Sequence, residues 1–420
     1  MTFLNENSFT KKLCAWMMAF IIISLLITPH PLLHAEPLIV QFENKNLETI
    51  IRNKLNKPSG KLTAIDMASL KDITAHSLQI TSLKGLEHAI NLQKLSIVNS
   101  DVRDLSPIAK LDQLQSITFI NNQISDLSPL KELKKLRDLD LSQNLISDLS
   151  PLATIKSLQT LNLSANLIFD IEPLHDLDQM YRLYLYDNYI EDLTAVQAMD
   201  RLNLLDVTGN LVSDLSPISH MKSLSVLYVN HNPIQSVEPI QDLRIFSLNI
   251  SNSNVADLTP LKNLNNLQYL DIGNSLPLDQ PSLQFLERFK TAAGNKVDHM
   301  EDYSPPKIFI NGMVQPFAVR PEYYNNRIMT PLRSLLEWTG VDWSWNSKTR
   351  KVTLKHLSKE IILTIDSNEL IENGKPRKID VAPYIRDGYT MVPIRFVTEA
   401  FGFKLEYDDN LNWVKLTNSN

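Results

Sequence analysis

Residues able to support catalysis or to bind metal are present, but they are scattered along the chain. No Gly-x-Ser-x-Gly elbow and no glycine-rich phosphate loop occurs. The histidines after residue 35 show no His-x-x-x-His pair or comparable metal spacing; they are His76, His88, His175, His220, His231, His299 and His356. We therefore predict no catalytic residues, no metal site and no cofactor, and hence no enzyme.

Carboxylates recur in a fixed place. Most are 22 residues apart, and the series is Asp104, Asp126, Asp148, Asp170, Asp192, Asp214 and Asp257. Such regularity indicates a structural part of a repeat, with hydrogen bonding at turns or edges. A row of shared calcium ions is the alternative, because carboxylates in register can bind hard cations.

The chain is mildly acidic, with a formal net charge of −6 over 420 residues. Nucleic-acid binding requires a basic surface, so a nucleic-acid partner is not expected.

The N-terminal segment, residues 1–35, has the pattern of a secretory signal peptide. Lys11 and Lys12 precede an apolar run over residues 13–28, and cleavage is expected after Ala35. The run is short for a membrane span, although an uncleaved anchor remains an alternative. The only cysteine, Cys14, lies in this segment, so a cleaved chain has no disulfide. We expect a secreted, extracellular protein without stable membrane insertion, and association with the cell envelope is left open.

A 22-residue internal repeat is the strongest signal in the sequence. Ten units begin at Leu70, Leu92, Leu114, Leu136, Leu158, Met180, Leu202, Leu224, Ile245 and Leu267. In each, a Leu-x-Leu pair such as Leu139 and Leu141 alternates as a strand does, and stacked units share one core. An asparagine follows the strand, and its amide can satisfy backbone groups of adjacent units. This structural asparagine ladder is Asn122, Asn144, Asn166, Asn188, Asn210 and Asn232.

The second half of each unit carries Asp-Leu-Ser-Pro-Leu or a variant of it. Serine before proline favours the start of a short helical or 3₁₀ turn, which predicts an α/β solenoid with such turns on its back. The 22-residue period, the recurring asparagine and the Asp-Leu-Ser-Pro-Leu motif together resemble the leucine-rich repeats of internalins, which are proteins of Gram-positive bacteria. The resemblance implies a horseshoe over residues 70–293 with a helical N-terminal cap over 36–69, whose helix is expected at residues 46–56.

A second duplication follows a polar linker, residues 294–306. Residues 307–420 divide into similar halves, 307–368 and 369–420, offset by 62 residues: Met329 matches Met391 and Gly340 matches Gly402. Each half predicts strands, a helix after Pro331 or Pro393, and a β-hairpin, which makes a small α+β domain. Met-Thr-Pro-Leu-Arg and Met-Val-Pro-Ile-Arg resemble the copper amine oxidase N-terminal domain. Copper chemistry is not expected, because His356 is the only histidine there.

The concave face of the repeats is the candidate binding site. Its solvent-side residues vary between units, and tyrosines with an arginine are typical of interaction hot spots. The candidate residues are Arg182, Tyr184, Tyr186, Asp206, Tyr228, His231, Tyr269 and Asp271. We expect a protein ligand there, with the C-terminal domain as an envelope-association module or spacer. A cell-wall polysaccharide-binding protein or a structural envelope protein is the alternative, because tyrosine rows also suit sugar stacking.

Overall fold

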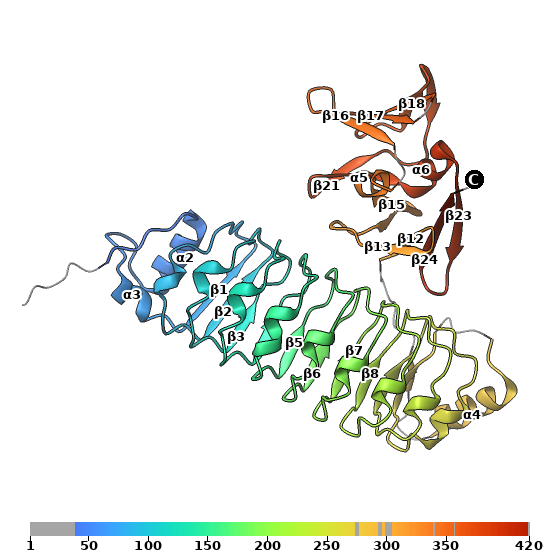
Figure 1. Cartoon of the computed structure of the whole chain (residues 1–420), viewed down its shortest axis with the longest axis horizontal. Helices are drawn as coiled ribbons and strands as arrows, with labels where there is room; N and C mark the ends of the chain where they lie inside the picture. Colours follow the sequence, from blue (N-terminus) through green and yellow to red (C-terminus); the bar gives the residue numbers. More distant parts are fainter. Residues whose placement is uncertain are drawn as a thin grey trace, which may run out of the picture.

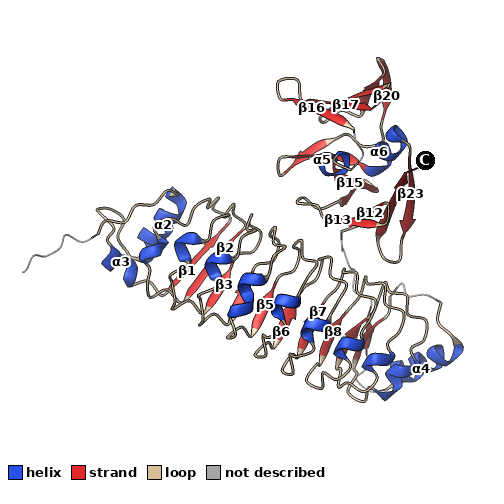
Figure 2. Ribbon diagram, in the orientation of Figure 1, coloured by secondary structure: helices blue, strands red, loops and turns tan. Residues whose placement is uncertain are grey.

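The computed structural model describes residues 38–273, 277–292, 296–298, 305–338, 341–356 and 358–418. A long repeat array carries a smaller C-terminal domain, here called the tail (Figure 1 and Figure 2). The predicted signal peptide lies outside the described residues. Within the described part of the chain, no helix has the length and apolar character needed to cross a membrane.

The array is one parallel sheet whose strands follow each other in chain order. They are β1 (Asp72–His76), β2 (Lys94–Val98), β3 (Ser116–Thr118), β4 (Asp138–Asp140), β5 (Thr160–Asn162), β6 (Arg182–Tyr184), β7 (Leu204–Asp206), β8 (Val226–Tyr228), β9 (Ser247–Asn249), β10 (Tyr269–Asp271) and β11 (Lys296–Asp298). Neighbouring strands pair one repeat apart, as Leu139 does with Leu161. The predicted α/β solenoid is confirmed, and coil n below means the repeat that contains strand n.

Short 3₁₀ helices lie opposite the sheet, at the predicted back of each coil (Figure 2). They are η1 (Leu86–His88), η2 (Ser106–Ile108), η3 (Ser128–Leu130), η4 (Ser150–Thr154), η5 (Glu172–Leu174), η6 (Thr194–Val196), η7 (Ser216–Ile218), η8 (Glu238–Ile240) and η9 (Thr259–Asn263). Proline occupies the first turn in seven of them, where its fixed φ suits a helix start.

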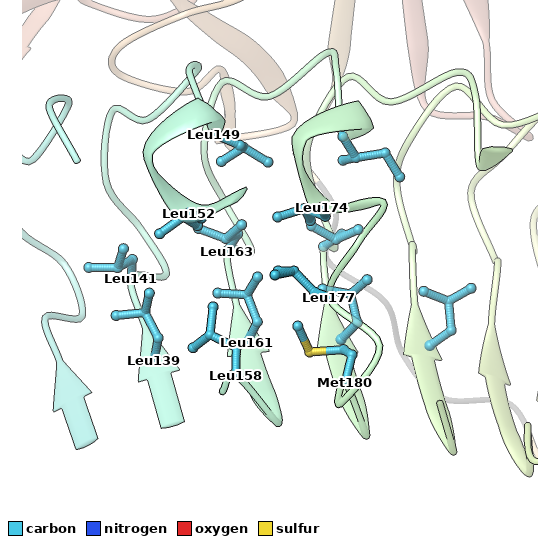
Figure 3. Close-up of a cluster of buried hydrophobic side chains, with 14 of the residues drawn as sticks. Leu139, Leu141, Leu149, Leu152, Leu158, Leu161, Leu163, Leu174, Leu177 and Met180 are labelled. Atoms are coloured by element: carbon cyan, nitrogen blue, oxygen red, sulfur yellow. The ribbon is translucent and has the colours of Figure 1, made fainter. Parts of the chain in front are cut away.

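Leucines from both halves of each coil meet between the sheet and the 3₁₀ helices (Figure 3). Leu139, Leu152, Leu161 and Leu174 are at most 1% exposed, and the same core runs from the cap to coil 10. Burying one such side chain contributes roughly 1.5–3 kcal/mol. The core is therefore a continuous column that no single coil could form alone.

Helices close both ends of this column. At the N-terminal end, α2 (Lys45–Lys54) begins at the N-cap Asn44 and buries Leu47 and Ile51, and a short α3 (Ala64–Ala68) follows it. At the other end, α4 (Gln280–Thr291) covers coil 10 with Leu286 and Phe289. Strand β11 lies within the segment that was expected to be a linker. It pairs with β10 and so extends the sheet by one strand after α4.

The tail contains three antiparallel or mixed sheets and two helices. Its strands are β12 (Lys307–Ile310), β13 (Met313–Gln315), β14 (Glu322–Tyr324), β15 (Arg327–Pro331), β16 (Asp342–Asn346), β17 (Lys351–His356), β18 (Lys359–Thr364), β19 (Glu369–Glu372), β20 (Lys375–Lys378), β21 (Tyr384–Arg386), β22 (Tyr389–Pro393), β23 (Phe403–Asp408) and β24 (Trp413–Asn418). The helices are α5 (Leu332–Leu336) and α6 (Ile394–Phe401), each starting directly after Pro331 or Pro393.

The two similar halves of the tail exchange strands. β12 of the first half pairs with β24 of the second, and β15 pairs with its counterpart β22. Leu335 of α5 and Val397 of α6 belong to one core. The halves therefore fold as one α+β unit, as the duplicated sequence predicts.

Candidate binding face

The solvent side of the β1–β11 sheet, here called the strand face, is built by alternation along each strand, although the outer residues Asn249 and Asp271 are themselves buried. In β6 the middle residue, Leu183, is fully buried, whereas Arg182 and Tyr184 on either side face solvent. The same holds in β8, with Leu227 inside and Tyr228 outside. Any residue type that tolerates water fits the outer positions, which frees them for recognition.

Parallel register places equivalent outer residues side by side in one column. Tyr184 pairs with Asp206, which pairs with Tyr228, then Asn249 and Asp271. Adjacent strands lie roughly 5 Å apart, so these five residues span about 20 Å. The structure thus brings four of the predicted candidates, Tyr184, Asp206, Tyr228 and Asp271, into one row.

A hollow of about 340 Å³ opens on the strand face of coils 8–10. Tyr228, Phe246 and Tyr269 line it together with Asn249 and Asp271. The rings of Phe246 and Tyr269 pack edge to face, with their centroids 5.2 Å apart. The quadrupoles of aromatic rings favour this arrangement. Aromatic walls with a few convergent polar groups are typical of binding sites.

Phe246 was missed from the sequence. It lies one residue before β9, outside the strand positions used to define the face. It takes the same place in its repeat as Tyr181 does in coil 6, so the available signal was an aromatic residue just before the strand.

The polar groups of the hollow are held in place by local hydrogen bonds. Asp271 Oδ1 accepts from the Gly273 amide at 2.9 Å, and Asn249 Oδ1 accepts from the Ser251 amide at 3.0 Å. Asp206 Oδ1 accepts in the same way from Thr208 at 3.0 Å. Each side chain is thereby fixed to the turn that follows its strand.

Arg182 and Tyr269 lie in the neighbouring column of the strand face, and two other predicted residues lie off the strands. His231 is in the turn after β8, is 7% exposed, and its Nε2 contacts Asn252 Nδ2 at 3.0 Å. Tyr186 follows β6 and is half-buried, and burial raises the pKa of its hydroxyl, with the Asp187 carboxylate acting in the same direction. The structure therefore does not place His231 or Tyr186 in the hollow.

The asparagine ladder connects neighbouring coils in the interior. Asn166 Oδ1 accepts from the Ile146 amide at 3.0 Å, and its Nδ2 donates to the Leu141 carbonyl at 3.0 Å and the Leu163 carbonyl at 2.9 Å. Its five counterparts are also nearly fully buried and bond the preceding coil in the same way. Amide groups satisfy backbone donors and acceptors that a turn would otherwise leave unpaired.

The recurring aspartates form turns on the back. Asp148 Oδ1 accepts from the Ser150 amide at 2.9 Å, and Oδ2 accepts from its hydroxyl at 3.0 Å. These bonds lower the pKa of the Asp148 carboxyl. Among the described residues, no group of three or more His, Cys, Asp or Glu is placed to hold a metal ion.

A contact between tail and array was not predicted. Arg320 donates to the Asp187 carbonyl at 2.8 Å and pairs with the Asp187 carboxylate at 3.2 Å. Lys307 Nζ lies 4.9 Å from the centre of the Tyr189 ring, which stacks on Phe169. Both array residues lie outside the strand positions, so no repeat pattern identified them.

Family comparisons assign both regions. Residues 112–154 and 134–174 match the family of leucine-rich repeats, and residues 309–416 match the copper amine oxidase N-terminal domain. Comparison with curated proteins gave no match.

Similar solved structures include two internalins of Listeria monocytogenes. An internalin (InlF) is 24% identical with a TM-score of 0.46, covering 60% of this chain and 89% of its own. Internalin C2 is 24% identical with a TM-score of 0.47, covering 56% and 97%. A leucine-rich-repeat protein of Leptospira interrogans is 18% identical with a TM-score of 0.44, covering 56% and 73%. The chain thus contains leucine-rich repeats in its array and, over residues 309–416, a match to the copper amine oxidase N-terminal domain.

Proposed function

We propose that this chain is a non-catalytic binding protein, secreted or held at the cell surface, that recognises a protein ligand on the strand face of coils 6–10. The tail acts as an envelope-association module or spacer. Leucine-rich repeats are typical of protein-binding proteins, which supports this class of function.

The hollow of coils 8–10 is the observation that carries the proposal. It combines three aromatic rings with fixed polar groups, the composition of interface hot spots. Tyr184 and Asp206 continue the same column toward coil 6, so a ligand in the hollow also meets these residues. Coils 4 and 5 present Asp140 and Asn162 in that column instead, without an aromatic ring.

Binding is tested with the full chain as bait against secreted and host protein extracts and against purified envelope material. A variant carrying Tyr184→Ala and Tyr228→Ala removes two rings from the strand face while leaving the core untouched. Tyr407→Ala is the matched control, because this tyrosine is 44% exposed and lies in the tail. We expect a captured protein to bind directly after purification, to be lost from the double variant and to be retained by the control.

Capture that survives in the double variant contradicts the proposal for this face. Capture of envelope glycan alone, unaffected by the two tyrosines, favours the polysaccharide-binding alternative. Secretion is checked by the intact mass of protein from the culture medium, which is expected to lack residues 1–35.

A further inference from the structure

A second cavity lies between the array and the tail. It has a volume of about 690 Å³, within the roughly 300–1,000 Å³ typical of ligand sites. The array side comes from the turns that follow the strands of coils 2–6, and the tail side comes from residues near β14, β21 and β22. Figure 1 shows the tail standing over the middle of the array on this edge. The cavity is therefore separate from the hollow of coils 8–10.

The array wall is a row of exposed side-chain amides. Asn99, Asn121 and Gln143 occupy the same turn position in coils 2, 3 and 4, each with a φ between 54° and 58°. Asn121 Nδ2 donates to Asn99 Oδ1 at 3.0 Å, so the amides are aligned along the array. Coils repeat about every 5 Å, and the row spans about 10 Å. It presents both donors and acceptors to the cavity.

The tail wall carries charges that are already paired. Arg386 Nη1 lies 2.5 Å from Glu322 Oε2, and its Nε lies 3.5 Å from Asp387 Oδ2. Tyr389 adds a half-buried ring from the tail side, as Tyr186 does from the array side.

The Arg320 contact closes one end of the cavity. Arg320 binds Asp187, the residue of coil 6 that takes the same turn position as the amides. The same turn position continues from the amides of coils 2–4 through Ala165 of coil 5 to Asp187 of coil 6, where the tail docks. A ligand in the cavity touches both parts of the molecule, provided that the tail remains docked.

The balance of charge and hydrogen-bonding groups selects the ligand chemistry. The cavity is lined by two arginines, both in ion pairs, and by four carboxylates, from Asp101, Asp187, Glu322 and Asp387. Excess negative charge disfavours an anionic polymer. Side-chain amides that donate and accept, with a tyrosine ring on each side, match the hydroxyl groups and apolar ring faces of sugars. We propose that the cleft between array and tail binds a neutral polysaccharide chain, separately from the protein ligand of the strand face.

The test uses the full chain on an array of neutral and anionic oligosaccharides, followed by calorimetric titration with the best neutral one. The site variant is Asn121→Ala with Gln143→Ala. The control is Asn265→Ala with Asn266→Ala, which removes two exposed amides from coil 9. We expect the site variant to bind the neutral oligosaccharide at least tenfold more weakly and the control to bind as the parent does.

A second variant, Arg320→Gln, removes the ion pair that joins the tail to Asp187 at one end of the cavity. We expect it to weaken oligosaccharide binding as well, because the site needs both parts. The proposal is overturned if no neutral oligosaccharide binds, if only anionic ones do, or if binding persists in the Asn121 and Gln143 variant. It is also overturned if an unstructured peptide binds at Asn121 and Gln143 and sugars do not. Tyr184→Ala with Tyr228→Ala leaves oligosaccharide binding unchanged, so this test and that of the strand face fail independently.

Discussion

The array and the tail are both products of sequence duplication, but they use it in different ways. In the array each coil contacts the coil before and after it, and sheet order equals chain order. In the tail, strands far apart in sequence pair: β12 with β24 and β15 with β22. The array is an open stack of coils, whereas the tail is a single unit in which strands of one half pair with strands of the other.

This difference determines how each region tolerates change. An open stack leaves its outer strand positions uncommitted, so coils 8–10 can form a hollow while coils 4 and 5 do not. The tail commits most of its strands to mutual pairing, and its second half supplies part of the core of the first. Side chains on the strand face can therefore change from coil to coil, whereas a core substitution in one half of the tail affects both halves.

The largest expected effect follows from removing the last hairpin. A chain ending at residue 402 lacks β23 and β24, which form half of the β13-β12-β24-β23 sheet and bury Val414 and Leu416. We expect the tail to unfold while the array keeps its structure. Calorimetry should then lose one transition and keep the other. Survival of both transitions would show that the halves fold separately.

Next in size is a core substitution in the middle of the array. Leu161 is fully buried, and Leu161→Ala should destabilise the array by about 2–5 kcal/mol because it leaves a cavity. The tail has its own hydrophobic core, separate from that of Leu161, so its own transition should stay in place. Denaturant unfolding followed separately in each part measures both. An equal shift of the two transitions would contradict the division into an open stack and a closed unit.

A smaller loss is expected from the asparagine ladder. Asn166→Ala should cost roughly 1–3 kcal/mol, because buried backbone groups of two coils lose their partners. Asn162→Ala is the control: Asn162 bonds Asp140 on the half-exposed strand face, where water replaces the lost partner. The measurement is the free energy of unfolding of both variants, compared with that of the parent protein. An unchanged midpoint for Asn166→Ala would refute the structural role of the ladder.

The smallest effect concerns the contact that joins the two regions. Burial lowers the pKa of Lys307 from 10.5 to about 8, against the opposing effect of the Asp187 carboxylate. The undocked tail therefore binds more protons between about pH 8 and 10.5, so docking should strengthen as pH rises through this window. Burial raises the pKa of Tyr189, which faces Lys307 together with Asp187 and Arg320, and its ionisation opposes docking at the upper end.

Dye-to-dye distances report this docking directly. Cysteines introduced as Lys131→Cys and Lys375→Cys, with Cys14→Ser, place one dye on each part. We expect the docked fraction to increase from pH 7.5 to 9.5, and Lys307→Met to abolish the increase. A docked fraction that falls over this range would show that loss of the Lys307 charge weakens the contact.

The sequence alone was sufficient for the solenoid, the ladder and the duplicated tail. Periodicity carries this information because each buried leucine or asparagine must recur wherever a coil meets the next. His231 shows the limit: its place beside the strand suggested the face, but it lies in the turn after β8, is 7% exposed and has its ring against Asn252. β11 was missed because a three-residue strand after a helix has no periodic signal of its own.

The repeated features could be predicted from the sequence, because the repeated residues contact the same kinds of neighbour in every coil. The contacts between different surfaces were decided by the tertiary structure. The Phe246–Tyr269 pair joins aromatic rings of two successive coils, and the contact of Arg320 with Asp187 joins residues 133 positions apart. Neither arises from a local pattern, because each depends on where two different surfaces meet after the chain has folded.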